Sequence, residues 1–289
     1  MSHGVLSVVH GTGSARTRLA ALAGFFGTLL ALVLAVPGTA DAADAGRGHM
    51  THPQLDWMGS TLRANEGPAP AAGTNAITPL VAQTPGMDVS GYQGNVNWST
   101  AWANGGKFAY VKATEGTSYT NPYFAQQYNG SYNVGMIRGA YHFALPDVSS
   151  GATQADYFIA HGGGWSADGK TLPGALDIEY NPYGATCYGL SQSGMVSWIA
   201  SFSNEYHART GRYPTIYSAT SWWTTCTGNS SAFSATNALW IARYSTSVGT
   251  LPAGWGFQTI WQFSDAGTFP GDQDRFNGAL DRVQAYALG

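Results

Sequence analysis

The sequence has few charged side chains for its length. Asp, Glu, Lys and Arg make up 10% of its 289 residues, whereas about a quarter of an average soluble domain is charged. The 13 basic and 16 acidic residues nearly balance, so the chain lacks the basic excess of a nucleic-acid-binding protein. Hydrophobic residues account for 44%, which is too many for a disordered chain. We therefore expect a folded protein without a nucleic-acid partner.

Long apolar runs are also scarce. The one clear run, residues 19–36, follows Arg16 and Arg18 and precedes A-x-A-like cleavage sites at 40–42 and 43–45. This order predicts a secretory signal peptide over residues 1–45. A membrane anchor is the alternative, because the run is nearly long enough to span a bilayer. The two cleavage sites favour removal, so we expect a secreted, extracellular protein with no membrane contact after processing.

Cysteine is nearly absent, with only Cys187 and Cys226 in the chain. An even number of cysteines in an exported protein indicates one disulfide. No Cys/His pair has zinc-binding spacing, so we expect no metal site. A G-x-x-x-x-G-K-[ST] phosphate loop and a G-x-S-x-G nucleophile elbow are missing as well, and we expect no cofactor.

Glycine and aromatic residues, in contrast, are abundant, with 38 Gly, 16 Tyr and 10 Trp. This composition is typical of extracellular proteins that handle carbohydrates. Residues 46–85 are rich in Pro, Ala, Gly and Thr and are interpreted as a linker or pro-segment, in which Asp56 and Glu66 would be solvated. The amino-acid composition of residues 86–289 is uniform, and no repeat occurs there, so these residues are expected to form a single domain.

Short β-like runs alternate with longer segments across this domain. The gaps between runs have the length of a crossover or helix, and residues 195–209 carry helical spacing. This alternation predicts an α/β fold, a single irregular (β/α) TIM-like barrel with mostly parallel strands. The seven runs are residues 86–90, 108–113, 137–143, 174–180, 214–218, 238–243 and 259–263.

Most runs acquire a polar or aromatic group near their carboxyl ends, the face where barrel enzymes place their active sites. The sharpest case is Asp177 and Glu179, which alternate along one run and would share a strand face roughly 6–7 Å apart. Like charges at that spacing make one carboxyl hold its proton. An acid beside a carboxylate suits cleavage of a glycosidic bond. A calcium-binding pair or a solvated strand end is the alternative.

Other candidates lie at the same predicted rim. Closure of the barrel would bring Asp88, in the first run, near Asp272 at the end of the chain. Asp272 and Asp274 would otherwise belong to an Asp-Gly turn, and Asp88 would be a capping residue. At strand ends, the candidate substrate-binding groups are Tyr141, Tyr217 and Gln262, with core packing as the alternative.

Taken together, these stretches resemble the family-25 glycoside hydrolases, the bacterial and phage muramidases called lysozymes. The resemblance runs from about residue 86 to the carboxyl terminus, with the motifs in family order. The matching stretches are Met87-Asp-Val-Ser-Gly-Tyr-Gln-Gly94, Phe108-Ala-Tyr-Val-Lys-Ala-Thr-Glu-Gly116, Arg138-Gly-Ala-Tyr-His-Phe143, Leu176-Asp-Ile-Glu179 and Trp261-Gln-Phe-Ser264.

The resemblance implies a role for each carboxylate. Glu179 would be the general acid, Asp177 would orient or stabilise the reacting N-acetyl group, and Asp88 would position substrate. Asp272 takes the place of the family aspartate, whereas Asp274 stands where the family has Asn, which leaves the roles of these two open. The two cysteines match positions that are disulfide-bonded in secreted actinobacterial-type members.

The expected function is hydrolysis of the β-1,4 bonds between N-acetylmuramic acid and N-acetylglucosamine in peptidoglycan, by a monomer. The substrate's acetamido carbonyl would attack the anomeric carbon, with Asp177 stabilising the oxazolinium; direct attack by water, with Asp88 or Asp272 as base, is the alternative. A catalytically inactive wall-binding module and a chitinase-like glycosidase are the other candidates. The full Asp-x-x-Asp-x-Asp-x-Glu run of chitinases is missing, because Leu172-Pro-Gly-Ala-Leu precedes Asp177.

Overall fold

The strands of the protein form one sheet that closes on itself. The computed structural model describes residues 55–67 and 82–289, and within them nine strands follow the order β1-β9-β8-β7-β6-β5-β4-β2-β3. Their bounds are β1 (Thr84–Val89), β2 (Phe108–Glu115), β3 (Tyr119–Thr120), β4 (Ile137–Phe143), β5 (Ala175–Asp177), β6 (Thr215–Ser218), β7 (Leu239–Ala242), β8 (Ile260–Ser264) and β9 (Asp272–Phe276).

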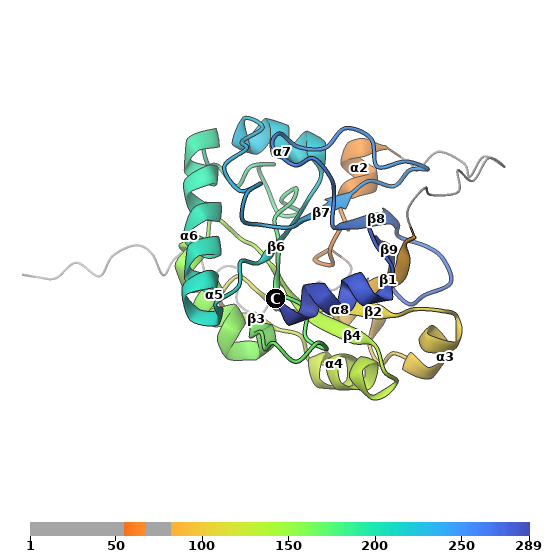
Figure 1. Cartoon of the computed structure of the whole chain (residues 1–289). Helices are drawn as coiled ribbons and strands as arrows, with labels where there is room; N and C mark the ends of the chain where they lie inside the picture. The colour runs from red at the N-terminus through yellow and green to blue at the C-terminus, as the bar shows by residue number, and fades with distance from the viewer. Residues whose placement is uncertain (1–54, 68–81) are drawn as a thin grey trace, which may run out of the picture. The chain divides into compact units, whose positions relative to one another are not determined.

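Pairing between β1 and β2 closes eight of these strands into a barrel, and β3 extends the sheet from β2 (Figure 1). The neighbours β1–β2, β2–β4 and β4 through β8 are all parallel. Only β9, between β1 and β8, is an antiparallel member of the barrel. The prediction of an irregular, mostly parallel barrel is confirmed.

The final barrel strand, β9, was not among the seven predicted runs. Its sequence, Asp272-Gln-Asp-Arg-Phe276, lacks the apolar pattern of the other strands and was considered as a turn. The strand forms because β1 and β8 flank it on both sides and satisfy its backbone groups. Burial of Asp272 and Asp274 is the consequence.

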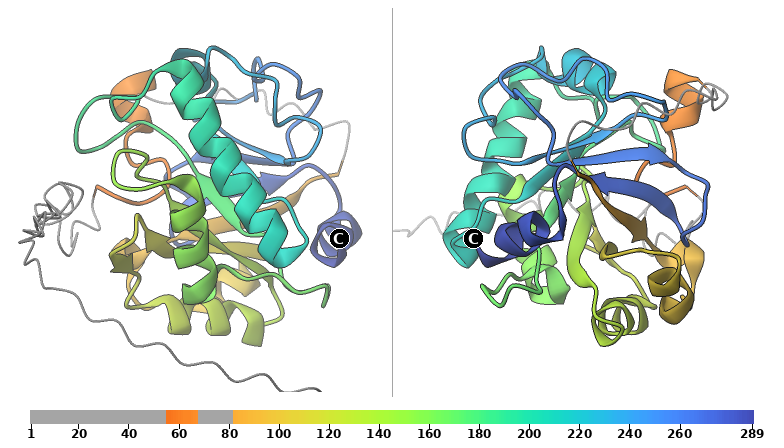
Figure 2. Two further views of the ribbon diagram at one scale, coloured as in Figure 1. Left: turned by 90° about the vertical axis from the view of Figure 1, so that its left-hand side faces the viewer. Right: turned by 45° about the vertical axis from the view of Figure 1, so that its right-hand side comes forward.

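Helices cover the outside of the barrel. The long helix α6 matches the predicted segment 195–209, and it packs against α5 (Figure 2). Ser191 caps its amino end by accepting a hydrogen bond from the backbone N–H of Gly194 at 3.1 Å. The helices are α2 (Leu62–Glu66), α3 (Trp98–Ala103), α4 (Phe124–Asn133), α5 (Gly151–Phe158), α6 (Gln192–Thr210), α7 (Thr220–Thr227) and α8 (Leu280–Leu288), with a 3₁₀ turn at Gly91–Gln93 and a π turn at Ile159–Gly163.

Aromatic side chains fill part of the barrel interior. The ring of Trp240 lies 4.7 Å from that of Tyr110 and 5.4 Å from that of Tyr217, measured between centroids. All three side chains are fully buried. Because a close-packed interior leaves rings little freedom, these three side chains are held in fixed positions.

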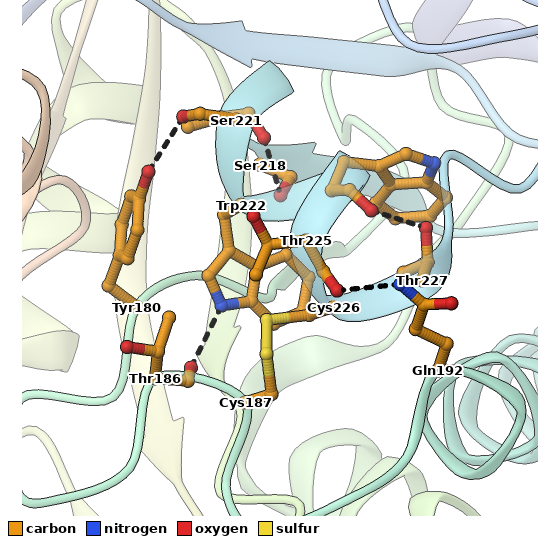
Figure 3. The surroundings of a disulfide bond; sticks show 12 residues. Tyr180, Thr186, Cys187, Gln192, Ser218, Ser221, Trp222, Thr225, Cys226 and Thr227 are labelled. Atoms are coloured by element: carbon orange, nitrogen blue, oxygen red, sulfur yellow. Dashed lines mark hydrogen bonds between the residues drawn. A yellow bond between two sulfur atoms is a disulfide. The ribbon is translucent and has the colours of Figure 1, made fainter.

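The predicted disulfide between Cys187 and Cys226 is present and ties the loop before α6 to α7 (Figure 3). Trp222 packs beside it and donates a hydrogen bond from its indole to the carbonyl of Thr186 at 3.0 Å. A bridge across 39 residues stabilises the fold by about 4 kcal/mol in the chain-entropy model.

The predicted signal peptide, residues 1–45, lies outside the described residues. Of the predicted linker or pro-segment, the part that is described contacts the barrel. The expectation that Asp56 is solvated is wrong: its side chain is 1% exposed, because it pairs with buried Lys112. In the described parts of the chain, no helix combines the length and apolar character needed to cross a membrane.

Candidate active site

Five carboxylic side chains gather at one end of the barrel interior. Asp88 lies near the end of β1, Asp177 ends β5, and Asp272 and Asp274 belong to β9. Glu179 follows β5 by two residues, so the predicted strand over 174–180 is shorter than expected. Each of the five side chains is at most 2% exposed. The structure thus brings together all four acidic residues predicted from the sequence, together with Asp274.

Gln262 joins two of these carboxylates. Its Nε2 donates to Asp88 Oδ2 at 2.9 Å and to Asp272 Oδ2 at 2.8 Å. Its Oε1 accepts a hydrogen bond from the hydroxyl of Tyr217 at 2.7 Å. The Tyr217 hydroxyl thereby fixes the orientation of the amide, with its N–H groups toward the carboxylates. Two of the three predicted substrate-binding candidates, Tyr217 and Gln262, therefore lie within the site.

Asp88 and Asp274 form a second pair of buried, interacting carboxyls. Two buried carboxyls that interact favour a state in which one of them holds a proton and can donate it to the other. Burial and the charge of Asp88 raise the pKa of Asp274 well above its usual value. Trp240 donates to Asp274 Oδ1 at 3.1 Å, while Oδ2 has no other partner. Asp274 is therefore the neutral member, and it donates to Asp88.

A protonated Asp274 has nearly the shape and hydrogen bonds of an asparagine. We expect Asp274→Asn to retain activity within about threefold, because its amide can still accept from Trp240 and donate to Asp88. Steady-state rates on peptidoglycan measure this. Asp274→Leu serves as the control, since it removes both hydrogen bonds, and equal loss in the two variants would contradict the neutral assignment.

Asp177 and Glu179 form the other pair of interacting carboxyls. Burial and the charge of Glu179 raise the pKa of Asp177 well above its usual value. Burial raises the pKa of Glu179 to about 7, against the opposing effect of its hydrogen bonds. Neither oxygen of Asp177 has a hydrogen-bond partner in the described residues. Both shifts favour retention of a proton by the pair, which is what acid catalysis requires.

Glu179 also receives two hydrogen bonds from the N-terminal segment, residues 55–67. The backbone N–H of Gly59 donates to Oε1 at 2.6 Å, and the hydroxyl of Thr61 donates to Oε2 at 3.1 Å. The third predicted substrate-binding residue, Tyr141, accepts from the backbone N–H of Met58 at 3.3 Å. The sequence shows a possible short amphipathic piece over residues 55–62, but this pattern gives no sign of contacts with the distant carboxylates.

A buried ion cluster lies beside the site. Lys112 Nζ is 2.6 Å from Glu115 Oε2 and 3.4 Å from Asp56 Oδ1, and it also donates to the carbonyl of Asp56. The hydroxyl of Tyr183 donates to Glu115 Oε1 at 3.1 Å. Glu115 is thus occupied by an ion pair, which favours a structural role.

The described residues offer no group of three or more His, Cys, Asp or Glu side chains arranged to hold a metal ion. A cavity of about 640 Å³ lies between α2 and α7, lined by Leu62, Thr220, Ser221 and Tyr244 among others. None of the five buried carboxylates lines this cavity. The end of the barrel that holds the five carboxylic side chains is instead occupied by the N-terminal segment, residues 55–67.

Comparison with known proteins gives consistent matches. The model of glycosyl hydrolases family 25 matches residues 87–272. An N,O-diacetylmuramidase of Chalaropsis sp is 54% identical over 208 residues, which cover 71% of this chain and 99% of that protein. Lysozyme M1 of Streptomyces globisporus is 43% identical over 278 residues, 94% of this chain and 95% of that protein. A solved lysozyme from Streptomyces coelicolor has a TM-score of 0.70 and 48% identity, covering 72% of this chain and 98% of its own.

Proposed function

The chain belongs to glycosyl hydrolases family 25, and from this membership we propose that it is a secreted muramidase. Its substrate would be the glycan strand of bacterial peptidoglycan, cut at the β-1,4 bond between N-acetylmuramic acid and N-acetylglucosamine. The observation that carries the proposal is the buried pair of carboxyls, Asp177 and Glu179, at the carboxyl end of β5, where burial raises the pKa of both. Export and a monomeric state are part of the same proposal.

In the proposed reaction, Glu179 donates its proton to the glycosidic oxygen as the bond from that oxygen to the anomeric carbon breaks. The carbonyl oxygen of the substrate's own acetamido group bonds to the anomeric carbon, which gives a cyclic oxazolinium. Asp177, two residues before Glu179 at the end of β5, would stabilise its positive charge when it is ionised. Water then opens the ring, and Glu179 takes up the proton that water loses.

The position of Asp177 supports substrate assistance over direct attack by water. Inverting glycosidases separate their two carboxyls by about 6.5–9.5 Å to leave room for a water molecule. The charge of Glu179 raises the pKa of Asp177, which indicates that the two carboxyls lie close together rather than on opposite sides of a bound sugar. Asp88 and Asp272, the alternative bases, are held by the amide of Gln262. We propose that these two position the acetamido-binding groups.

The products of peptidoglycan digestion test the assignment. We expect the protein to release soluble fragments that carry N-acetylmuramic acid at their reducing ends, identified by mass spectrometry after borohydride reduction. Reduced glucosamine ends would instead mean a glucosaminidase. Binding to the wall without release of fragments would favour the binding module. Cleavage of chitin oligosaccharides alone would favour the chitinase-like reading.

A further inference from the structure

The proposed site is covered by the chain's own N-terminal segment. A glycan must touch Glu179 to receive its proton, yet this side chain is 1% exposed. Gly59 and Thr61 donate to its two oxygens, which leaves no oxygen free for the substrate. The segment, orange in Figures 1 and 2, lies beside β7 and β8 of the barrel.

The peptide group between Met58 and Gly59 lies at the centre of these contacts. Its carbonyl accepts from Gln262 Nε2 at 3.1 Å, and its N–H donates to Glu179 at 2.6 Å. The next carbonyl, that of Gly59, accepts from the hydroxyl of Tyr244 at 3.3 Å. An N-acetyl sugar carries the same secondary amide as a peptide group. The segment therefore places an amide against the groups that the proposed substrate would use.

Only glycine fits at position 59. Its φ is +87°, a backbone conformation that L side chains rarely adopt. A Cβ there would lie 2.5 Å from the hydroxyl of Tyr244, 2.6 Å from Gln262 Oε1 and 2.9 Å from the hydroxyl of Tyr217. The backbone at Gly59 therefore packs directly against the site residues and leaves no space for a side chain.

Ion pairs and buried side chains hold the segment on both sides of Gly59. On one side, buried Asp56 pairs with Lys112. On the other, Arg63 pairs with Asp265, and Glu66 accepts hydrogen bonds from Tyr180 and Ser221. The apolar side chains of Met58 and Leu62 are 0% and 2% exposed. Buried charge pairing and apolar burial together indicate a docked segment rather than a passing linker.

We propose that residues 55–67 are an intramolecular inhibitor, so that the chain is catalytically latent until this segment leaves the site. The inference rests on the proposed function, because it concerns the same catalytic pair. Docking also works against a general acid at Glu179. The hydrogen bonds from Gly59 and Thr61 oppose the effect of burial and favour the carboxylate, whereas a general acid must hold the proton.

Two matched glycine substitutions in the full chain test this inference. Gly59→Val introduces a Cβ where three polar atoms lie within 3 Å, and it should expel the segment. Gly67→Val is the control, since Gly67 has nearly the same φ, +83°, but nothing lies within 4 Å of its Cβ. We expect Gly59→Val to release peptidoglycan fragments at least about tenfold faster than the wild-type chain, equivalent to about 1.4 kcal/mol. Gly67→Val should match the wild type.

Two further measurements guard against a misfolded variant. Thr61→Val removes only the hydroxyl that donates to Glu179, and it should raise the rate by a smaller factor. A synthetic peptide of residues 55–67, added to Gly59→Val, should suppress the gained activity, whereas the same peptide with Val at position 59 should not. Mass spectrometry of the protein samples confirms that the segment is still attached in each.

The outcomes separate the two proposals. A wild-type chain as active as Gly59→Val, while hydrogen exchange shows the Gly59 amide protected only in the wild type, would overturn latency and leave the muramidase assignment intact. A Gly59→Val chain with an exchanging segment and no cleavage of peptidoglycan would overturn the muramidase assignment, and latency with it. A rate gain in Gly59→Val that the peptide reverses supports both.

Discussion

Replacing Glu179 with glutamine is expected to slow peptidoglycan cleavage by about 10²–10⁴-fold, the usual contribution of a general acid. Glutamine keeps the size and polarity of the side chain but has no acidic proton for the leaving oxygen. The rate is best compared in the Gly59→Val background, where the N-terminal segment does not cover the site. Binding to insoluble peptidoglycan should persist, because the size and shape of the side chain are nearly unchanged.

Glu205→Gln is the matched control for this substitution. Glu205 is a partly exposed residue of α6 whose carboxylate lies 3.5 Å from Arg209 Nη1, on the outside of the barrel. The same chemical change there should leave the rate unaltered. Full lytic activity in Glu179→Gln would remove Glu179 from the role of general acid.

The pH profile gives a second readout of the same group. Burial raises the pKa of Glu179 to about 7 from a usual value of 4.5. The proton needed for catalysis is held below the pKa of Glu179 and lost as the pH rises through it, so activity should show an alkaline limb above the usual value of 4.5. This alkaline limb should be missing from the residual activity of Glu179→Gln.

Asp177→Asn is expected to reduce kcat by about 10²–10³-fold, similar to the loss of other groups that stabilise transition-state charge. Asparagine retains the hydrogen-bonding shape but carries no negative charge to stabilise the oxazolinium.

Asp274→Asn serves as the matched control for Asp177→Asn. The same substitution is made in the other carboxyl pair, where the replaced carboxyl is already neutral and donates to Asp88. Measurement of kcat and KM separately distinguishes the two cases: the loss for Asp177→Asn should lie in kcat. A rate for Asp177→Asn equal to that of Asp274→Asn would argue against a role in charge stabilisation.

The barrel and most of its acidic residues could be predicted from the amino-acid sequence alone. Seven strands were recognisable because each is a short apolar run between helix-length segments, a pattern set by neighbouring residues. Asp88 and Asp177 were identifiable for the same reason, since they stand at the carboxyl ends of such runs. The disulfide followed from the even count of two cysteines in a chain predicted to be exported.

The raised pKa values of the site and the position of residues 55–67 could not be predicted from local sequence, because both depend on the tertiary structure. The raised pKa values of Asp177 and Asp274 arise from burial and from carboxyls on other parts of the fold. Strand β9 forms from a polar sequence because β1 and β8 lie on either side of it. The hydrogen bond between Gly59 and Glu179 joins residues 120 positions apart in the sequence, and that between Met58 and Gln262 joins residues 204 positions apart. Contacts at such separations leave no local periodicity in the sequence, because they depend on how the closed barrel places distant residues together.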